Sequence, residues 1–149
     1  MRVWRLARAV HRALDGKGAR GAGGRWNSPG VPVVYTSGTL SLAVLELLVH
    51  TDRDLLPGDL RAFEIEVGSV TPSMLDVARL PADWRDIPNH PACRAAGDEW
   101  LRQGRHLLLG VPSAIVPEEL NYLINPAHTK AARVRTVRAR SFSFDKRLL

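Results

Sequence analysis

The connections between the expected strands are the feature that most limits how this 149-residue chain can fold. Strands are predicted where β-branched and apolar residues cluster or alternate with polar ones, over residues 3–8, 31–37, 61–67, 106–113 and 132–145. Helices are predicted over residues 39–50, 91–104 and 117–126. Several connections are too short to contain the crossover helix that parallel neighbours need. The sequence therefore predicts an α+β domain with a mixed or antiparallel sheet, not a doubly wound one.

Length, charge and cysteine content narrow the class of protein. We expect one domain over residues 1–149. Cys93 is the only cysteine and cannot form an internal disulfide, so the expected compartment is the reducing cytoplasm. The net charge of +6 suits nucleic acid, an acidic protein or a phosphate-bearing small molecule. The densest basic stretch, KAARVRTVRAR, contains no aromatic residues to stack on bases, and no Cys/His spacing predicts a metal site.

Glu46 is unusual because the helix that carries it is apolar nearly all round. This helix runs from Thr39 to His50, with Ser37 or Thr39 as the expected N-cap, and its composition predicts burial on all sides. An ionised carboxylate in such a place is costly unless it is paired or hydrogen-bonded. Three explanations remain open, an ion pair with an arginine inside the fold, a glutamate that faces water at a gap in the core, and a role in catalysis.

Two residues upstream of this helix favour the catalytic explanation. Arg25 lies in GGRWN, within a glycine- and proline-rich loop expected over residues 15–32, and its guanidinium suits phosphate oxygens. Tyr35 lies near the end of a strand, and Ser37, two residues further on, shares its face. Taken singly, each residue has an ordinary explanation, Arg25 as a surface arginine and Tyr35 as a core aromatic. Together with Glu46 they predict a site for a substrate that carries both an anionic and a cationic group.

Two further stretches contain residues that could serve a site. GKGARG, residues 16–21, has the glycine spacing of a dinucleotide-binding turn, but no strand is expected directly before it, so we interpret it as flexible loop. Ser113 follows a buried strand, and Asn121 and Asn125 are expected on one face of the helix 117–126. Capping and turn formation are the ordinary roles of such residues.

Taken in order, these stretches resemble the RES-domain toxins, the toxic halves of bacterial RES–Xre type II toxin–antitoxin systems. The resemblance depends on GGRWN-SPG-VPVVYTS, the apolar helix with Glu46, and VPSAIVPEELNYLINPAH, and it extends from VWRLA to DKRLL. It implies a fold like that of ADP-ribosyltransferases and cleavage of the nicotinamide–ribose bond of NAD⁺, a substrate rather than a cofactor. Hydrolysis, phosphorolysis and transfer of ADP-ribose to a protein are all possible outcomes. The implied partner is an Xre-type antitoxin with a DNA-binding domain, in an oligomeric complex.

The resemblance also implies which residues form the site. The arginine, glutamate and serine of the family name fall on Arg25, Glu46 and Ser113, and Tyr35 matches the family's tyrosine. Arg5 matches an arginine that holds NAD in related transferases, so Arg5 and Arg25 both remain candidates for the main phosphate clamp. The other residues expected on the substrate side are Ser37, Asn121 and Asn125.

The chemistry implied for these residues is that of glycoside cleavage. Departure of nicotinamide leaves positive charge on the ribose, which a fixed carboxylate such as Glu46 would stabilise. Tyr35 would pack against nicotinamide or ribose, and Ser113 would contact the nicotinamide side or an incoming phosphate. Two alternatives lack catalysis, a basic nucleic-acid-binding module and a domain that only docks an antitoxin. The segment from Thr51 to Gly104 resembles the family less clearly, and there we expect the partner or acceptor to be determined.

Overall fold

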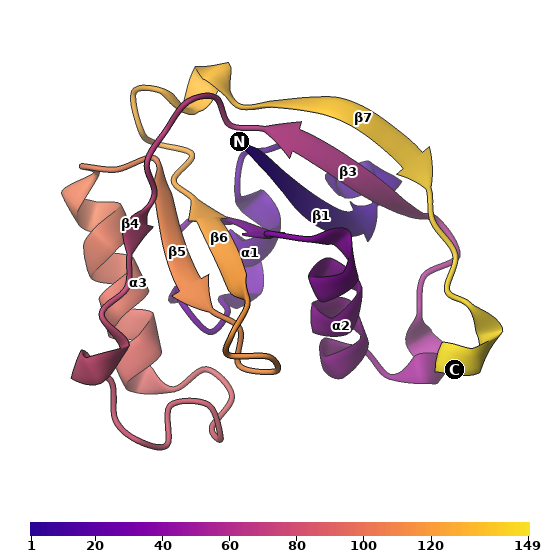
Figure 1. Ribbon diagram of the computed structural model, residues 1–149, viewed down its shortest axis with the longest axis horizontal. Helices are drawn as coiled ribbons and strands as arrows, with labels where there is room; N and C mark the ends of the chain where they lie inside the picture. Colours follow the sequence, from indigo (N-terminus) through magenta and orange to yellow (C-terminus); the bar gives the residue numbers. More distant parts are fainter.

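A seven-stranded mixed sheet with helices on its faces forms the protein (Figure 1), in a computed structural model that describes all residues, 1–149. The strand order is β4-β5-β6-β2-β1-β3-β7. The strands are β1 (Arg2–Arg8), β2 (Val34–Ser37), β3 (Leu60–Glu66), β4 (Ser73–Met74), β5 (Leu108–Pro112), β6 (Leu120–Ile124) and β7 (Arg135–Ser141). The α-helices are α1 (Lys17–Ala22), α2 (Leu40–His50) and α3 (Pro91–Gln103). Only β4 and β5 are parallel, which confirms the predicted α+β class with a mixed sheet.

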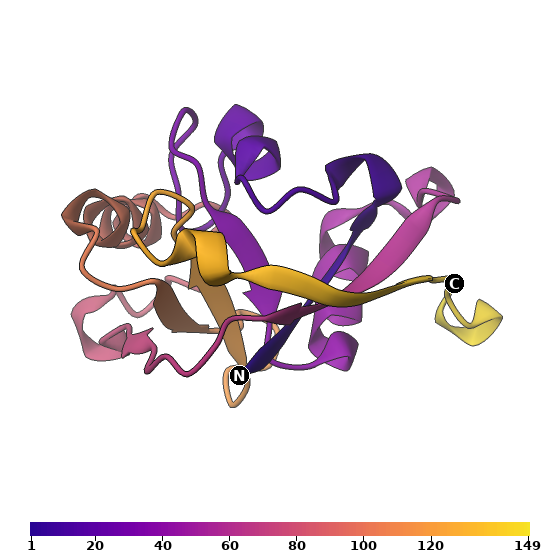
Figure 2. The same ribbon diagram turned by 90° about the horizontal axis from the view of Figure 1, so that it is seen from above.

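The sheet consists of two halves that meet at one residue pair. β1 pairs with β3 along seven residues, but with β2 only where Trp4 lies opposite Ser37. Beyond that pair β1 and β2 separate. Helix α2 packs against β1 and β2, and α3 lies at the other end of the molecule, beside β4 and β5 (Figure 1 and Figure 2). Ser37 therefore occupies the junction between the halves.

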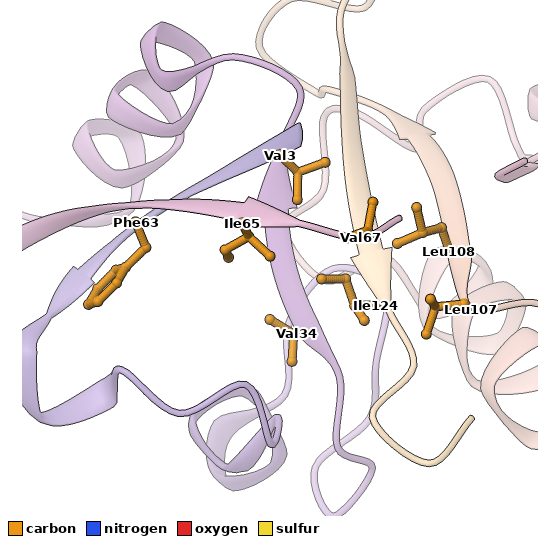
Figure 3. Close-up of a cluster of buried hydrophobic side chains, with 8 residues drawn as sticks. All are labelled: Val3, Val34, Phe63, Ile65, Val67, Leu107, Leu108 and Ile124. Carbon is orange, nitrogen blue, oxygen red and sulfur yellow. The ribbon is translucent and has the colours of Figure 1, made fainter. Parts of the chain in front are cut away.

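Both faces of the central strands are buried. On one face, apolar side chains from β1, β2, β3, β5 and β6 or their immediate ends form a cluster (Figure 3) consisting of Val3, Val34, Phe63, Ile65, Val67, Leu107, Leu108 and Ile124. On the other face, Leu109, Val111 and Leu123 pack with three tryptophans, Trp26, Trp84 and Trp100. All five residues of β5 are buried, as its nearly continuous apolar run predicts.

The helix predicted over residues 117–126 is wrong, because this segment contains strand β6. Leu120–Ile124 lies between β2 and β5 and pairs with both. The local signals, a proline at either end and apolar residues at helical spacing, are overridden because β2 and β5 would otherwise each have an unpaired edge. Asn121 therefore lies within a strand and Asn125 just after it, not on one helical face.

Three other predictions differ from the structure in part. Helix α2 begins after its N-cap Thr39 as expected, but it has one buried face only, since Leu45 is 40% and Val49 61% exposed. The loop expected over residues 15–32 contains α1, so GKGARG does begin a helix, although no strand directly precedes it. The short strand β4 was not predicted, and β7 is shorter than the predicted strand 132–145.

The end of α3 at Gly104, which has a φ of 62°, matches the prediction. None of the helices has the length and apolar character that a bilayer span requires.

Candidate active site

Glu46 is held by two neutral side chains that reach it from other elements. It lies in the middle of α2, whose first turn is capped by Thr39 accepting a hydrogen bond from the backbone N–H of Leu42. Its Oε1 accepts hydrogen bonds from Oγ of Ser113 at 2.8 Å and from Nδ2 of Asn121 at 2.6 Å. The side chain is 24% exposed, so the carboxylate is half-buried and still open to solvent or a ligand.

The second oxygen of Glu46, Oε2, accepts no hydrogen bond from the protein. The only basic group within 4 Å is Nε2 of His50, 3.9 Å away and one helical turn further along α2, and no lysine or arginine pairs with the carboxylate. The His50 side chain is 66% exposed. The two carboxylate oxygens are therefore in different situations, one fixed by the protein and the other available.

Ser113 uses its hydroxyl completely within the protein. Its Oγ donates to Glu46 and accepts from the backbone N–H groups of Ile115 and Val116, at 3.1 and 3.2 Å. Ser113 is buried in the turn that follows β5. The expected contact of Ser113 with substrate remains a prediction, and it would require one of these three hydrogen bonds to be given up.

Asn121 and Ser37 complete a network across the sheet. They are directly opposite in β6 and β2, and Oγ of Ser37 donates to Oδ1 of Asn121 at 2.7 Å. Asn121 then donates its amide N–H to Glu46. Glu46, Ser113, Asn121 and Ser37, all proposed from the sequence, are therefore brought together by the fold.

Tyr35 lies on the same face of β2 as Ser37, but its hydroxyl is directed to the GGRWN loop. It donates to Oδ1 of Asn27 at 2.6 Å and accepts from the backbone N–H of Trp26 at 3.0 Å. Burial raises the pKa of Tyr35 to about 12, so the phenol stays protonated at neutral pH. A Cβ at Gly24 would lie 2.6 Å from this hydroxyl, which explains the glycine there.

Arg25 is not in contact with Glu46. Its Nη1 donates to the backbone carbonyls of Trp84 at 2.7 Å and Ile87 at 3.3 Å, and the guanidinium lies 5.8 Å from the centre of the Trp84 ring. The arginine thus connects the GGRWN loop to the segment that precedes α3. Its expected role as a phosphate clamp remains a prediction.

Arg5 faces a separate small cavity. Strand alternation places it on the face of β1 opposite to Trp4, the residue that pairs with Ser37. Its Nη1 donates to the carbonyl of Ala13 at 3.1 Å. Burial lowers the pKa of Arg5 below its ordinary value, with the nearby charge of Asp15 opposing this effect. The cavity has a volume of about 120 Å³ and is lined by Arg5, Val10, His11, Ala13, Asp15, Lys17 and Gly18.

Asn125 has a local structural role. It is buried, and its Oδ1 accepts from the backbone N–H of Ala127 at 3.0 Å, while Nδ2 donates to the carbonyl of Leu101 at 3.4 Å. It thereby shapes the turn after β6 and links it to α3. The structure places it in contact with none of the other predicted site residues.

Helix α3 holds the GGRWN loop in place, a function that sequence reasoning missed. Nε of Arg94 donates to the carbonyl of Gly24 at 2.9 Å, and Asp98 accepts from both the backbone N–H and the hydroxyl of Ser28. Asn27, fully buried, donates to two backbone carbonyls of the surrounding loop. Only Asn27 had a signal in the sequence, as a polar residue inside GGRWN; Arg94 and Asp98 look like ordinary exposed helix charges.

No group of three or more His, Cys, Asp or Glu side chains is arranged to hold a metal ion. The RES domain family profile matches residues 2–145. The chain is 40% identical over 139 residues to the "Prs ADP-ribosylating toxin" of Sphingobium sp. (strain YBL2). The matched region covers 91% of this chain and 86% of that protein. It is 38% identical over 152 residues to "Toxin Res" of Photorhabdus laumondii, covering 100% of this chain and 97% of that one.

The fold also resembles a chain in the crystal structure of the M. tuberculosis MbcT–MbcA toxin–antitoxin complex, with a TM-score of 0.75. That match covers 95% of this chain and 84% of the other at 19% sequence identity, so it concerns the fold alone. The family profile covers nearly the whole chain, and the two relatives exceed one-third identity over most of their length. This protein belongs to the RES domain family.

Proposed function

We propose that this protein is a cytoplasmic toxin that breaks the nicotinamide–ribose bond of NAD⁺. The observation that carries the proposal is the half-buried carboxylate of Glu46, with Oε1 held by Ser113 and Asn121 and Oε2 free. The names of the relatives, an ADP-ribosylating toxin and two further RES-family proteins called toxins, support it. Hydrolysis, phosphorolysis and transfer of ADP-ribose to a protein all begin with cleavage of this bond.

The reaction proceeds through a positively charged ribose. The bond between C1′ and the pyridinium nitrogen breaks, and both electrons stay with the nitrogen, so nicotinamide leaves as a neutral molecule. C1′ and the ring oxygen share the positive charge that remains, as in glycoside hydrolysis. The fixed negative charge of Glu46 stabilises this state, more strongly because the site is partly shielded from water. An acceptor oxygen then forms the new bond to C1′.

Arg5 and Arg25 both remain candidates for the group that holds the pyrophosphate. The Arg5 guanidinium makes a single hydrogen bond, to a backbone carbonyl, and forms no ion pair with a carboxylate. Arg5 lies, however, on the face of β1 opposite to Trp4 and Ser37, whereas Asn121, the partner of Glu46, shares the face of Ser37. Arg25 donates to two backbone carbonyls and would have to leave them before it could bind phosphate. Arg25 and Tyr35 also shape the GGRWN loop through their hydrogen bonds.

The acceptor of the ADP-ribose group distinguishes two forms of this function. Depletion of NAD⁺ uses phosphate or water, and protein modification uses a side chain of a target. The name of the Sphingobium relative favours the second form as an alternative. Incubation of the purified protein with NAD⁺, with and without inorganic phosphate, separates them, since phosphorylated ADP-ribose, free ADP-ribose and labelled protein are different products.

Glu46→Gln tests the role of the carboxylate itself. The amide keeps the shape of the side chain but removes its charge, and kcat should fall roughly 10²- to 10³-fold. Glu118→Gln is the matched control, because Glu118 is exposed and its side chain makes no hydrogen bond. Normal turnover by Glu46→Gln would rule out the mechanism. Unchanged NAD⁺ after long incubation with the wild type would favour a non-catalytic docking or nucleic-acid-binding domain instead.

The proposed partner is an antitoxin of the Xre type, with a DNA-binding domain, in a hetero-oligomeric complex. The similarity in fold to a chain solved within a toxin–antitoxin complex supports this, and the net charge of +6 suits an acidic partner surface. Co-purification of the two proteins, with loss of NAD⁺ turnover in the complex, is the expected result. Turnover that is unchanged by a bound antitoxin would contradict the idea that it blocks the site.

A further inference from the structure

One oxygen of the Glu46 carboxylate is hydrogen-bonded to the protein and the other is not. This difference points to a residue that positions the carboxylate. We propose that Asn121 is a positioning residue, which with Ser37 behind it fixes the rotamer of Glu46 and leaves Oε2 directed at the substrate. The inference rests on the proposed function of Glu46. It differs from the expectation that Asn121 and Ser37 bind substrate directly.

Ser37 and Glu46 hold the Asn121 amide from opposite sides. Oδ1 accepts from the Ser37 hydroxyl at 2.7 Å, and Nδ2 donates to Oε1 of Glu46 at 2.6 Å. The reversed amide would place Oδ1 against the carboxylate oxygen, with two acceptors and no proton between them. Ser37 is buried and lies directly opposite Asn121 in the sheet, so the pair cannot separate without breaking the β2–β6 register. The sheet therefore fixes where the amide lies, and the carboxylate, which only accepts, keeps Nδ2 on its side.

Two donors on one oxygen restrain the carboxylate in two directions. Ser113 approaches from the turn after β5 and Asn121 from β6, so rotation of the Glu46 side chain would break both hydrogen bonds. The hydroxyl of Ser113 is itself fixed by two backbone N–H groups. Asn121 belongs to the sheet and Ser113 follows β5 directly, whereas Glu46 belongs to a helix with only one buried face. The network thus ties the position of Oε2 to the sheet.

The charged groups near this network are few. His50 lies 3.9 Å from Oε2, and Glu119 lies next to the start of α2, with its Oε2 3.5 Å from the hydroxyl of Thr39. Neither contacts Asn121. A charge introduced at residue 121 would consequently act mainly on Glu46.

Asn121→Asp tests the proposal because it replaces the donor with an acceptor of nearly the same shape. At neutral pH two carboxylates would face each other, and kcat should fall roughly 10- to 100-fold with little change in KM. At acidic pH the pair would share one proton, which restores a donor to Glu46. The activity of this variant should therefore recover as the pH falls, giving a pH profile displaced to lower pH than that of the wild type. A purely structural role would produce no such recovery.

Ser37 provides a second, milder pair of variants. Ser37→Ala removes the hydroxyl that holds Oδ1 of the Asn121 amide and should lower kcat several-fold, whereas Ser37→Thr keeps the hydroxyl and should restore turnover. This pair tests the proposal even if Asn121→Asp does not fold. Urea unfolding of each variant verifies that loss of activity is not loss of structure.

Three results would overturn the positioning role. They are full activity of Asn121→Asp at neutral pH, an equal loss at every pH, and a rise in KM alone, which would make Asn121 a substrate-binding residue. Glu46→Gln separates this failure from failure of the proposed function. If Glu46→Gln is inactive while Asn121→Asp is normal, only the positioning role is lost. If Glu46→Gln is fully active, the proposed mechanism itself is wrong.

Discussion

Replacing Gly97 by alanine should damage the site from a distance, because this glycine lies directly against the GGRWN loop. A Cβ at residue 97 would lie 1.8 Å from the carbonyl oxygen of Trp26, whereas Cβ atoms essentially never approach another heavy atom within 3.0 Å. Helix α3 and the loop would have to separate by at least the difference, 1.2 Å. That movement also stretches the hydrogen bonds between Asp98 and Ser28, one helical position away.

The magnitude follows from three contributions. Overpacking of a tight contact costs about 1–3 kcal/mol. Loss of a hydrogen bond to a charged group, here Asp98, costs about 1.5–3 kcal/mol. Alanine in place of glycine inside a helix offsets roughly 1 kcal/mol of this. The free energy of unfolding should therefore fall by about 3 kcal/mol, which for a chain of this size lowers Tm by roughly 6–12 °C.

Thermal and urea unfolding followed by circular dichroism, together with NAD⁺ turnover, measure the effect. Turnover should fall by more than the fraction of protein that becomes unfolded. The reason is that the displaced backbone carries Arg25 and the Trp26 N–H that holds Tyr35. Gly21→Ala is the matched control, since Gly21 is also helical and a Cβ there meets nothing within 4 Å. If the free energies of unfolding of the two variants differ by less than about 1 kcal/mol, which is the size of the helix-propensity difference alone, the packing argument is refuted.

Two further predictions concern single hydrogen-bonding groups. Tyr35→Phe leaves the Trp26 N–H and the side-chain Oδ1 of Asn27 without their partner, so the free energy of unfolding measured in urea should fall by about 1–3 kcal/mol, and unchanged stability would contradict this. Arg102, and then Gln103, hold the pKa of Glu99 at about 2, below its ordinary 4.5, so this stabilisation is complete above pH 4.5 and is lost as the pH falls towards 2. Glu99→Gln should therefore be less stable than the wild type at pH 6 but nearly as stable at pH 2.5. If urea unfolding gives the same difference in stability at both pH values, the pKa of Glu99 is not lowered by these partners.

The centre of the site could be predicted because its residues conflict with their surroundings. Glu46 is the one acidic residue in an otherwise apolar helix, and a carboxylate there needs partners. The structure supplies these from Ser113 and Asn121, both singled out in the sequence. The contacts of Arg25 and Tyr35 could not be predicted in the same way. Their side chains suit a ligand and a loop equally well, and only the fold shows that they bond to the loop.

The main errors concern interactions between segments distant in sequence. Residues 117–126 have helix signals over a short range, yet residues 120–124 form a strand because they pair with the nearby β5 and with β2, which lies more than 80 positions earlier. Likewise, the contact of Gly97 with Trp26 leaves no trace in either local sequence. The segment from Thr51 to Gly104, expected to determine the partner or acceptor, contains in α3 the support for the GGRWN loop.

The partners of Glu46 also bear on the explanations that its sequence left open, and they argue most directly against an ion pair inside the fold. A structural ion pair requires an arginine or lysine at the carboxylate, and such a pair would neutralise the charge before any substrate arrived. Glu46 has instead two neutral donors, and its only basic neighbour within 4 Å is a largely exposed histidine. Neutral donors hold the group in place and leave its full negative charge to act elsewhere. A fold that gains nothing from pairing this charge internally, yet fixes it with three side chains from two strands and a turn, is best explained by a positive charge that arrives with the substrate.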